Sequence, residues 1–190
     1  NGKLASGKDT IAPAVMAQLG VSDALHNYYA VPLKAEVDSV VAIITMAQGA
    51  DEAAATVASQ FGIDPAQAGF VTGVLWHHTR ATGHGLTARS RTPEMRTVLQ
   101  YWGTEVRRRQ DSDYWVKRAM IPAVEAISRG QSVYFTDVRF ANEVEWAQRL
   151  GFFVVRLEVS AEVQHARHVL RDGTEPNPET LAHPSEVSLD

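Results

Sequence analysis

The feature that most constrains this chain is a loop bounded by glycines at its start. Residues 2–8 read Gly-Lys-Leu-Ala-Ser-Gly-Lys and match the pattern G-x-x-x-x-G-K. The glycines allow a tight turn whose amide hydrogens, together with a helix N-terminus, can surround a phosphate, and the lysine adds positive charge. The pattern predicts a phosphate-binding loop (a P-loop), with a glycine-rich turn that binds nothing as the alternative. The residues expected from this pattern to surround the phosphate are Gly2, Gly7 and Lys8.

The position after Lys8 departs from the usual form of this loop. Asp9 stands where Ser or Thr is common, and Thr10 follows it. A loop of this kind works with magnesium, which prefers oxygen ligands and keeps several waters. The sequence leaves open whether Asp9 holds the ion, directly or through water, or whether Thr10 serves it.

Composition narrows the classes of partner. The 190 residues, 45% of them hydrophobic, suit a single core, and the net charge of -4 disfavours binding to a nucleic acid polymer through its phosphates. The absence of cysteine excludes disulfides, thiolate zinc sites and a cysteine nucleophile, and fits a cytoplasmic location. No apolar run approaches the roughly 18 residues that cross a bilayer, so we expect no membrane partner.

Hydrophobic spacing and the places of glycine and proline predict mostly helices. Helices are expected over about 9–19, from 34, over about 54–61, from 93, from 114, over 142–150 and beyond 162. Short apolar runs predict strands at 24–31, closed by Pro32, at 133–135 and at 152–155. Residues 80–93, rich in glycine and arginine, predict an exposed, mobile loop, and residues 103–105 predict a break between helices.

The strands indicate the fold class. Residues 133–135 and 152–155 are continuous apolar runs on either side of a helical stretch, which is typical of strands buried on both faces in a parallel sheet. The chain is therefore expected to be an α/β protein. Because a phosphate loop normally follows a buried strand, we also expect a further strand before Asn1.

A second acidic residue follows the strand at 133–135. Asp137 would lie at the carboxyl edge of a parallel sheet, where ligands bind, and could orient magnesium. A helix-capping aspartate is the alternative interpretation. Arg139 follows closely, and its planar fork suits a phosphate group, although a surface or ion-paired arginine has the same local sequence.

Further arginines and an aromatic side chain are candidates for the same chemistry. Residues 107–109 are three successive arginines, which are either a solvated helix face or part of a site, and Trp115 could pack against a base. Arg167 and Arg171 lie four residues apart, so both could face the same phosphates as a closing lid, or form a basic helix surface. The histidines show no recognised metal-ligand spacing.

Taken in order along the chain, these motifs resemble the bacteriophage deoxynucleoside monophosphate kinases. The resemblance spans nearly the whole chain and rests on the order and spacing of its pieces. These are residues 2–10, Ala30-Val31-Pro32-Leu33-Lys34, residues 99–108 with Gly103-Thr104-Glu105 and Arg108, Asp113-Tyr114-Trp115, residues 137–143 and His183-Pro184-Ser185-Glu186. Arg107 departs from the family pattern, in which a small residue is common at this position.

The resemblance implies transfer of the γ-phosphoryl group of ATP to a deoxynucleoside 5′-monophosphate, with magnesium, in a cytoplasm that would be the host's for a phage protein. It implies a single three-layer P-loop kinase domain with a parallel sheet flanked by helices, a helical substrate-binding insertion at about 35–130 and a lid at about 160–182. The number of copies in the assembly, including a homodimer, stays open.

By position, the resemblance also implies a role for each candidate residue. The ATP phosphates would be bound by Ser6, Gly7, Lys8, Asp9 and Thr10. The monophosphate site would contain Lys34, Arg108, Trp115, Asp137 and Arg139. Magnesium would be held by Asp9 and Asp137. Phosphoryl transfer would depend on Lys8, Asp137, Arg139 and the lid residues Arg167 and Arg171.

Three other functions compete with this one. The chain could be another small-molecule P-loop kinase, similar to phosphomevalonate or dephospho-coenzyme A kinases. It could instead be a module that binds ATP without transferring phosphate, or an assembly protein whose glycine loop is accidental. These hypotheses differ in whether ADP forms and in which acceptor it requires.

Overall fold

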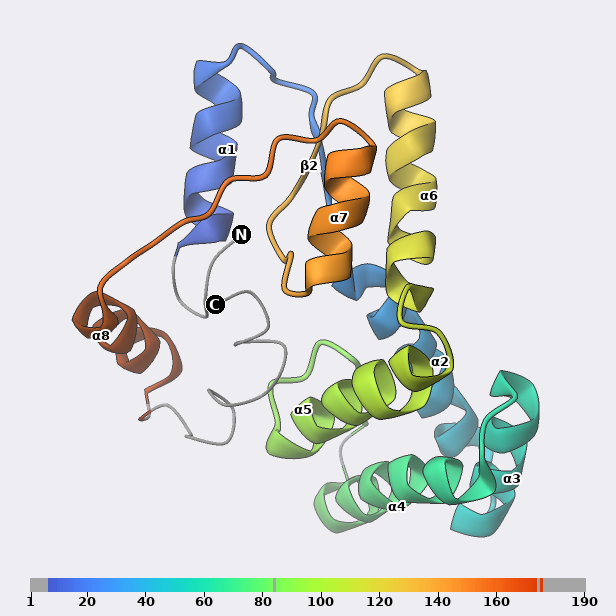
Figure 1. Ribbon diagram of the computed structural model, residues 1–190. Helices are drawn as coiled ribbons and strands as arrows, with labels where there is room; N and C mark the ends of the chain where they lie inside the picture. The colour runs from blue at the N-terminus through green and yellow to red at the C-terminus, as the bar shows by residue number, and fades with distance from the viewer. Residues whose placement is uncertain (1–6, 84, 174, 176–190) are drawn as a thin grey trace. The chain divides into compact units, whose positions relative to one another are not determined.

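The structure, a computed structural model, describes residues 7–83, 85–173 and 175, without the side chains of residues 171 and 172 (Figure 1). The chain divides into two compact units. Unit 1 combines Asn1–Tyr29 with Val116–Asp190, and unit 2 is Ala30–Trp115. The predicted helical insertion, 35–130, thus overlaps unit 2, but residues 116–130 belong to unit 1.

Unit 1 contains a parallel pair of strands. β1 (Leu25–Asn27) pairs with β2 (Val133–Phe135), with Leu25 opposite Val133 and Asn27 opposite Phe135. Its helices are α1 (Lys8–Gln18), most of α6 (Tyr114–Ser128), α7 (Ala141–Arg149) and α8 (Ala161–Asp172). Because the strands run parallel, the residues that follow them gather at one edge of the sheet.

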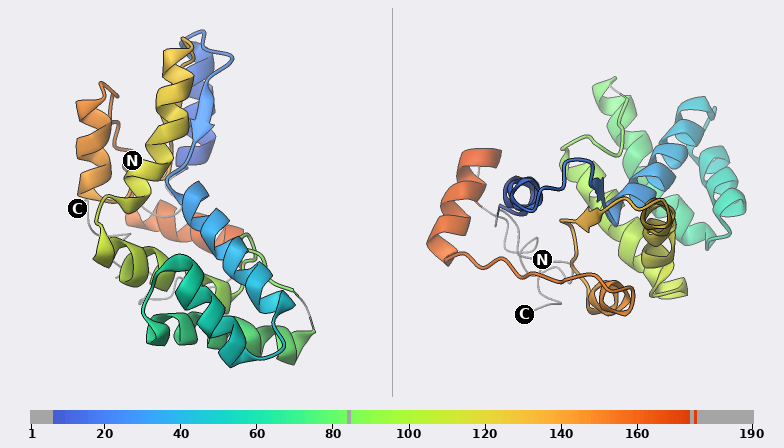
Figure 2. Two further views of the ribbon diagram at one scale, coloured as in Figure 1. Left: turned by 90° about the vertical axis from the view of Figure 1, so that its right-hand side faces the viewer. Right: turned by 90° about the horizontal axis from the view of Figure 1, so that it is seen from above.

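The two faces of this strand pair differ in chemistry. On one face the rings of His26 and Tyr134 stack with centroids 4.3 Å apart. On the other face Phe135 stacks on Tyr29, and the Asn27 amide donates to the Ala119 carbonyl of α6. The right-hand view of Figure 2 shows α1 and α6 on opposite sides of the strands. A core cluster lies on the α6 side, formed by Tyr29, Val116, Ala119, Met120, Ala123, Val138 and Ala147.

Unit 2 is built from helices. They are α2 (Ala30–Met46), α3 (Ala50–Phe61), α4 (Pro65–Thr82), α5 (Pro93–Gln100) and a π-helical segment, η1 (Tyr101–Arg108). Caps mark the boundaries, since Gly62 adopts a left-handed φ of 59° after α3 and the side chains of Asp64 and Thr92 accept amide hydrogens at the starts of α4 and α5. The core includes Val37, Val40, Val57, Val71, Leu75, Met95, Val98, Trp102, Val106 and Trp115.

Several expected elements are confirmed. The helices near 9–19, 54–61, 142–150 and beyond 162, the helix from Pro93 and the strand at 133–135 are all present. The helix over α4 was not predicted. The strand expected at 24–31 is shorter, because α2 begins at Ala30 and takes Pro32 into its first turn, where a missing amide hydrogen is tolerated.

Three other expectations are wrong in part. Residues 80–93 are not simply an exposed loop, since α4 continues to Thr82 and both Leu86 and Ala88 are buried. Residues 103–105 do not break the helix but lie inside η1. Residues 152–155 form no strand in the described chain, and Phe153 is 99% exposed. An apolar run does not by itself supply the ladder of backbone hydrogen bonds that defines a strand.

The parallel pairing of β1 with β2 is compatible with the α/β class, while the three-layer P-loop kinase arrangement and the strand before Asn1 stay predictions. Among the helices of the described chain, none combines the length and apolar character that a bilayer span requires.

Candidate functional site

Four polar side chains meet where the strands of unit 1 end. Thr136, the residue after β2, donates its hydroxyl hydrogen to Oδ1 of Asp9 in the first turn of α1. The same hydroxyl oxygen lies 2.9 Å from Nε2 of His26, on β1. Nδ1 of His26 lies 2.9 Å from the hydroxyl oxygen of Tyr28. The predicted Asp9 is therefore held at the carboxyl edge of the sheet by residues from both strands.

The protonation of His26 follows from these contacts. Because Thr136 uses its own hydrogen toward Asp9, its oxygen accepts from the imidazole, which assigns the hydrogen to Nε2 and leaves Nδ1 to accept from Tyr28. Burial lowers the pKa of His26, against the opposing charges of Asp9 and Asp137, and thus favours this neutral ring. Burial also raises the pKa of Tyr28, so its phenol keeps the hydrogen that it donates.

Asp137 is fixed on the same edge by the chain that leaves β1. Its Oδ1 accepts the backbone hydrogen of Tyr29 at 2.9 Å. The capping role does not apply to the helix that follows, because the N-cap residue of α7 is Phe140. The charges of both Asp9 and Asp137 also act on His26, where they oppose the lowering of its pKa by burial.

Arg139 belongs to this group. Burial lowers the pKa of its half-buried guanidinium, while the charges of Asp137, Glu143 and Asp9 raise it. The backbone amides of Arg139 and Phe140 donate to Oε2 of Glu143 at 2.7 and 3.1 Å, and Glu143 is buried. This carboxylate ties the segment that carries Arg139 to the start of α7. Asp9, Asp137 and Arg139, three of the predicted site residues, thus come together.

The described end of the glycine loop adjoins another predicted residue. Gly7 has a left-handed φ of 94°, and its carbonyl accepts the amide hydrogens of Thr10 and Ile11, so it starts α1 immediately before Lys8. Nη1 of Arg167, from α8, lies 3.2 Å from the point where a Cβ on Gly7 would stand. The predicted lid residue Arg167 therefore lies close to Gly7.

The remaining ATP-site and lid candidates are less completely placed. Lys8 is half-buried at the start of α1, and Thr10 is exposed. Arg171 lies in α8 one turn beyond Arg167, and its side chain is outside the described part of the chain. Gly2, Ser6 and residues 183–186 also lie outside the described residues.

The monophosphate-site candidates of unit 2 have different surroundings. Lys34 lies in α2, and Nη1 of Arg108, at the end of η1, is 3.4 Å from the carbonyl oxygen of Ser112. Trp115 is only 2% exposed, and its Nε1 donates to the carbonyl of Gly103 at 2.9 Å. A ring this buried offers no open face to a base, so the stacking role expected for Trp115 is not supported. Whether these residues meet Asp137 and Arg139 in one site stays a prediction.

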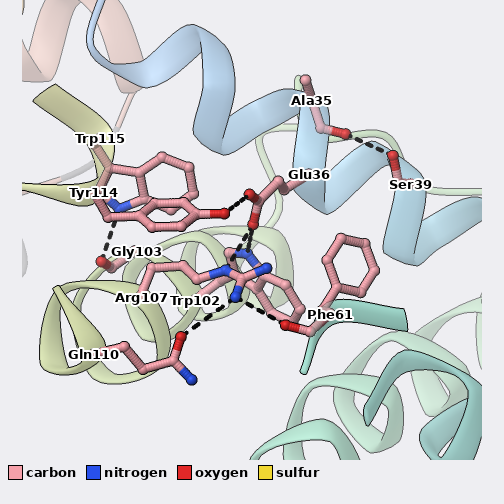
Figure 3. A network of polar contacts seen from close by, with 10 residues as sticks. All are labelled: Ala35, Glu36, Ser39, Phe61, Trp102, Gly103, Arg107, Gln110, Tyr114 and Trp115. Atoms are coloured by element: carbon pink, nitrogen blue, oxygen red, sulfur yellow. Dashed lines mark hydrogen bonds and ion pairs between the residues drawn. The ribbon is translucent and has the colours of Figure 1, made fainter. Parts of the chain in front are cut away.

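Arg107 occupies a core ion pair rather than a solvated helix face. Its Nε lies 2.9 Å from Oε2 of Glu36, which also accepts from Nε1 of Trp102 at 2.9 Å, while Oε1 of Glu36 accepts from the hydroxyl of Tyr114 (Figure 3). The guanidinium donates to the Phe61 carbonyl and lies over the rings of Phe61, Trp102 and Tyr114. The large side chain that departs from the resemblance pattern is therefore accommodated by a dedicated acidic partner.

The sequence interpretation missed His26, Tyr28 and Thr136. The available signal was their position, since His26 lies in β1 and Tyr28 and Thr136 directly follow β1 and β2. Their relation depends on the pairing of β1 with β2, because the hydrogen bond between His26 and Thr136 joins residues 110 positions apart.

The donor set at this edge suits magnesium. No group of three or more histidine, aspartate or glutamate side chains that could hold a metal occurs among the described residues. Magnesium bound with phosphates needs only one or two carboxylates, because phosphate oxygens and waters complete its shell. Oδ1 of Asp9 accepts from the Thr136 hydroxyl and Oδ1 of Asp137 accepts from the Tyr29 amide, and carboxylate oxygens of this kind are the ligands that magnesium prefers.

Comparisons with protein-family models, with curated proteins and with solved structures find no match to this chain.

Proposed function

We propose that the protein is a magnesium-dependent P-loop phosphotransferase that converts ATP and a deoxynucleoside 5′-monophosphate into ADP and the deoxynucleoside diphosphate. The observation that carries the proposal is the contact between Asp9 and Thr136. It brings the start of α1, with the loop lysine Lys8, to the edge where β1 and β2 end and where Asp137 and Arg139 lie. A phosphate-binding helix N-terminus, two carboxylates and an arginine are the groups that such a reaction needs.

The residues of the site would have separate roles in binding phosphate, binding magnesium and neutralising charge. Gly7, Lys8 and Thr10, with Gly2 and Ser6, bind the phosphates of ATP, and Asp9 and Asp137 hold the magnesium. Arg167 and Arg171 neutralise charge that develops on the transferred group. Magnesium, when bound, shields the negative charge of the phosphate oxygens. A protein that aligns two anions in this way needs no covalent intermediate.

On the acceptor side, Arg139 would bind the 5′-phosphate of the monophosphate, and the sequence resemblance adds Lys34 and Arg108 as further substrate-binding candidates. An oxygen of that phosphate forms a bond to the γ-phosphorus, and the bond from the γ-phosphorus to the bridging oxygen of ATP breaks, so ADP leaves. Because the incoming oxygen belongs to an ionised phosphate, no general base is required.

A coupled assay of ADP formation tests the proposal. The protein is incubated with ATP and magnesium and with each of the four common deoxynucleoside monophosphates in turn, and phosphomevalonate and dephospho-coenzyme A serve as acceptor controls. ADP release that depends on a deoxynucleotide supports the proposal and identifies the preferred base. ADP release with only a control acceptor, or nucleotide binding without transfer to any acceptor, overturns it.

A further inference from the structure

The carboxylate of Asp9 is exposed on the first turn of α1, yet its orientation is set by a buried hydroxyl. Thr136 is only 2% exposed, and its hydroxyl donates to Asp9 Oδ1. An exposed aspartate with no such contact would sample several rotamers in water. Here the hydrogen bond to a charged acceptor selects one of them, since such bonds are stronger than those between neutral groups.

Thr136 is in turn oriented by His26. The hydroxyl oxygen accepts from Nε2 of the imidazole, so its own hydrogen points to Asp9. The imidazole is held by stacking on Tyr134, at 4.3 Å, by its contact with the Tyr28 ring, at 4.0 Å, and by the hydrogen bond from the Tyr28 hydroxyl. With a neutral imidazole, the hydrogen bonds of this series run from Tyr28 to His26, from His26 to Thr136 and from Thr136 to Asp9.

The negative charges near Asp9 give its hydrogen bond from Thr136 a physical consequence. Asp9 and Asp137 both act on His26 and on Arg139, so two negative charges are gathered in one region. Like charges favour rotation of Asp9 away from Asp137 in the absence of a cation. A hydroxyl donor that retains Asp9 in place reduces the reorganisation needed when a cation arrives.

We propose that Thr136 and His26 are positioning residues that hold the Asp9 carboxylate ready for the divalent cation that accompanies the nucleotide phosphates. The proposal rests on the proposed function, because it takes the magnesium complex of a nucleotide as the ligand. It also answers the choice between Asp9 and Thr10, since Asp9 is the side chain that the strand ends hold at the sheet edge, whereas Thr10 is exposed on α1.

Calorimetric titration with ADP, in the presence of magnesium and in its absence with a chelator, tests the proposal without relying on turnover. Thr136→Val keeps the shape of the side chain and removes the hydroxyl, and Thr136→Ser keeps the hydroxyl. We expect magnesium to strengthen ADP binding to the wild type. We expect the magnesium-dependent gain in ADP affinity to be smaller by about tenfold or more in Thr136→Val than in the wild type, as for other groups that orient metal ligands. The affinity for ADP without magnesium should be unchanged.

His26 provides an independent pair of variants, monitored by thermal unfolding to show that each is folded. His26→Gln offers an amide donor close to the position of Nε2, whereas His26→Leu has none. We expect His26→Gln to retain most of the magnesium-dependent gain and His26→Leu to lose it to an extent similar to Thr136→Val.

The outcomes separate this inference from the proposed function. Absence of ADP binding by the wild type overturns the function, and the inference with it. A wild type that binds ADP more tightly with magnesium, together with folded Thr136→Val and His26→Leu proteins that gain equally from magnesium, overturns the inference alone. Variants that lose ADP affinity equally with and without magnesium also overturn the inference, because such a loss indicates a general effect on the nucleotide site.

Discussion

Nη1 of Arg167 lies 3.2 Å from the point where a Cβ on Gly7 would stand. Gly7 also has a φ of 94°, in the left-handed region that side chains with a Cβ rarely adopt. The backbone conformation therefore favours glycine at this position, and a Cβ there would in addition crowd the flexible tip of Arg167.

The first prediction concerns the variant Gly7→Ala. The left-handed conformation alone should lower the free energy of unfolding by about 1–2 kcal/mol. The added methyl group also displaces the tip of Arg167, so we expect ADP affinity to fall. Chemical denaturation and calorimetric titration measure the two effects.

Gly20→Ala is the matched control for that variant. Gly20 follows α1 with a φ of 72°, but nothing lies within 4 Å of a Cβ built there. Gly20→Ala should show a similar loss of stability with unchanged ADP affinity. Equal ADP affinity in both variants would contradict a role for the Gly7 and Arg167 contact in nucleotide binding.

The second prediction concerns the carboxylate of Glu36 in unit 2. It accepts from Arg107, Trp102 and Tyr114, and both charged side chains are largely buried, at 13% exposure for Glu36 and 8% for Arg107. Glu36→Gln leaves the guanidinium without its counter-charge, so we expect a loss of about 3 kcal/mol in the free energy of unfolding. Chemical denaturation followed by tryptophan fluorescence measures it.

Tyr114→Phe is the smaller perturbation of the same cluster. It removes one hydroxyl donor and leaves the ion pair between Glu36 and Arg107 in place, so a loss of about 1.5 kcal/mol is expected for a hydrogen bond to a charged group. A larger loss for Tyr114→Phe than for Glu36→Gln would show that the ion pair does not dominate this cluster.

Local sequence patterns were sufficient to indicate that Asp9, Asp137 and Arg139 lie near the strand ends of unit 1, while their roles stay predictions. Asp9, Asp137 and Arg139 were predicted from their positions after a loop glycine and after an apolar run, because the carboxyl edge of a parallel sheet collects such residues. This prediction requires only that the strands run parallel. It does not depend on which residues pair across the two strands.

The remaining features depend on contacts between distant residues. Gly103 resembles a helix breaker in sequence. In the structure, Cδ2 of Leu33 lies 3.3 Å from the position that a Cβ on Gly103 would take, so the Leu33 side chain occupies the space beside the glycine. The Gly103 carbonyl accepts a hydrogen bond from Nε1 of Trp115. Because of these tertiary contacts, the expected break is absent and the segment continues as η1. Trp115 was likewise assigned to a base because local sequence does not reveal that its indole is enclosed.

The third prediction separates charge from structure at Asp137. Asp137→Asn keeps an oxygen that can accept from the Tyr29 amide, so the thermal unfolding temperature should change little. The lost negative charge should reduce phosphoryl transfer by orders of magnitude. Lys8→Ala, on the half-buried first residue of α1, should behave in the same way. Unfolded variants, or folded ones with full activity, would contradict the assigned roles.

The fourth prediction is a pH dependence of stability due to His26. Burial lowers the pKa of His26 in the folded protein below 6.5, although Asp9 and Asp137 oppose the shift. Between the folded pKa and 6.5, the unfolded chain therefore binds more protons at this residue than the folded chain does. The contribution of His26 to the free energy of unfolding consequently rises with pH through that window and levels off above it.

The comparison of wild type with His26→Gln isolates this effect from the other titrating groups. Urea denaturation of both proteins at intervals between about pH 7.5 and about pH 5 gives the two stability curves. The chain has seven histidines, and the other six are present in both proteins, so only the difference between the curves reports on His26. We expect wild type to lose more stability than His26→Gln on acidification. A half-buried ring implies a modest difference, and parallel curves would show that His26 is not held in its neutral form by the fold.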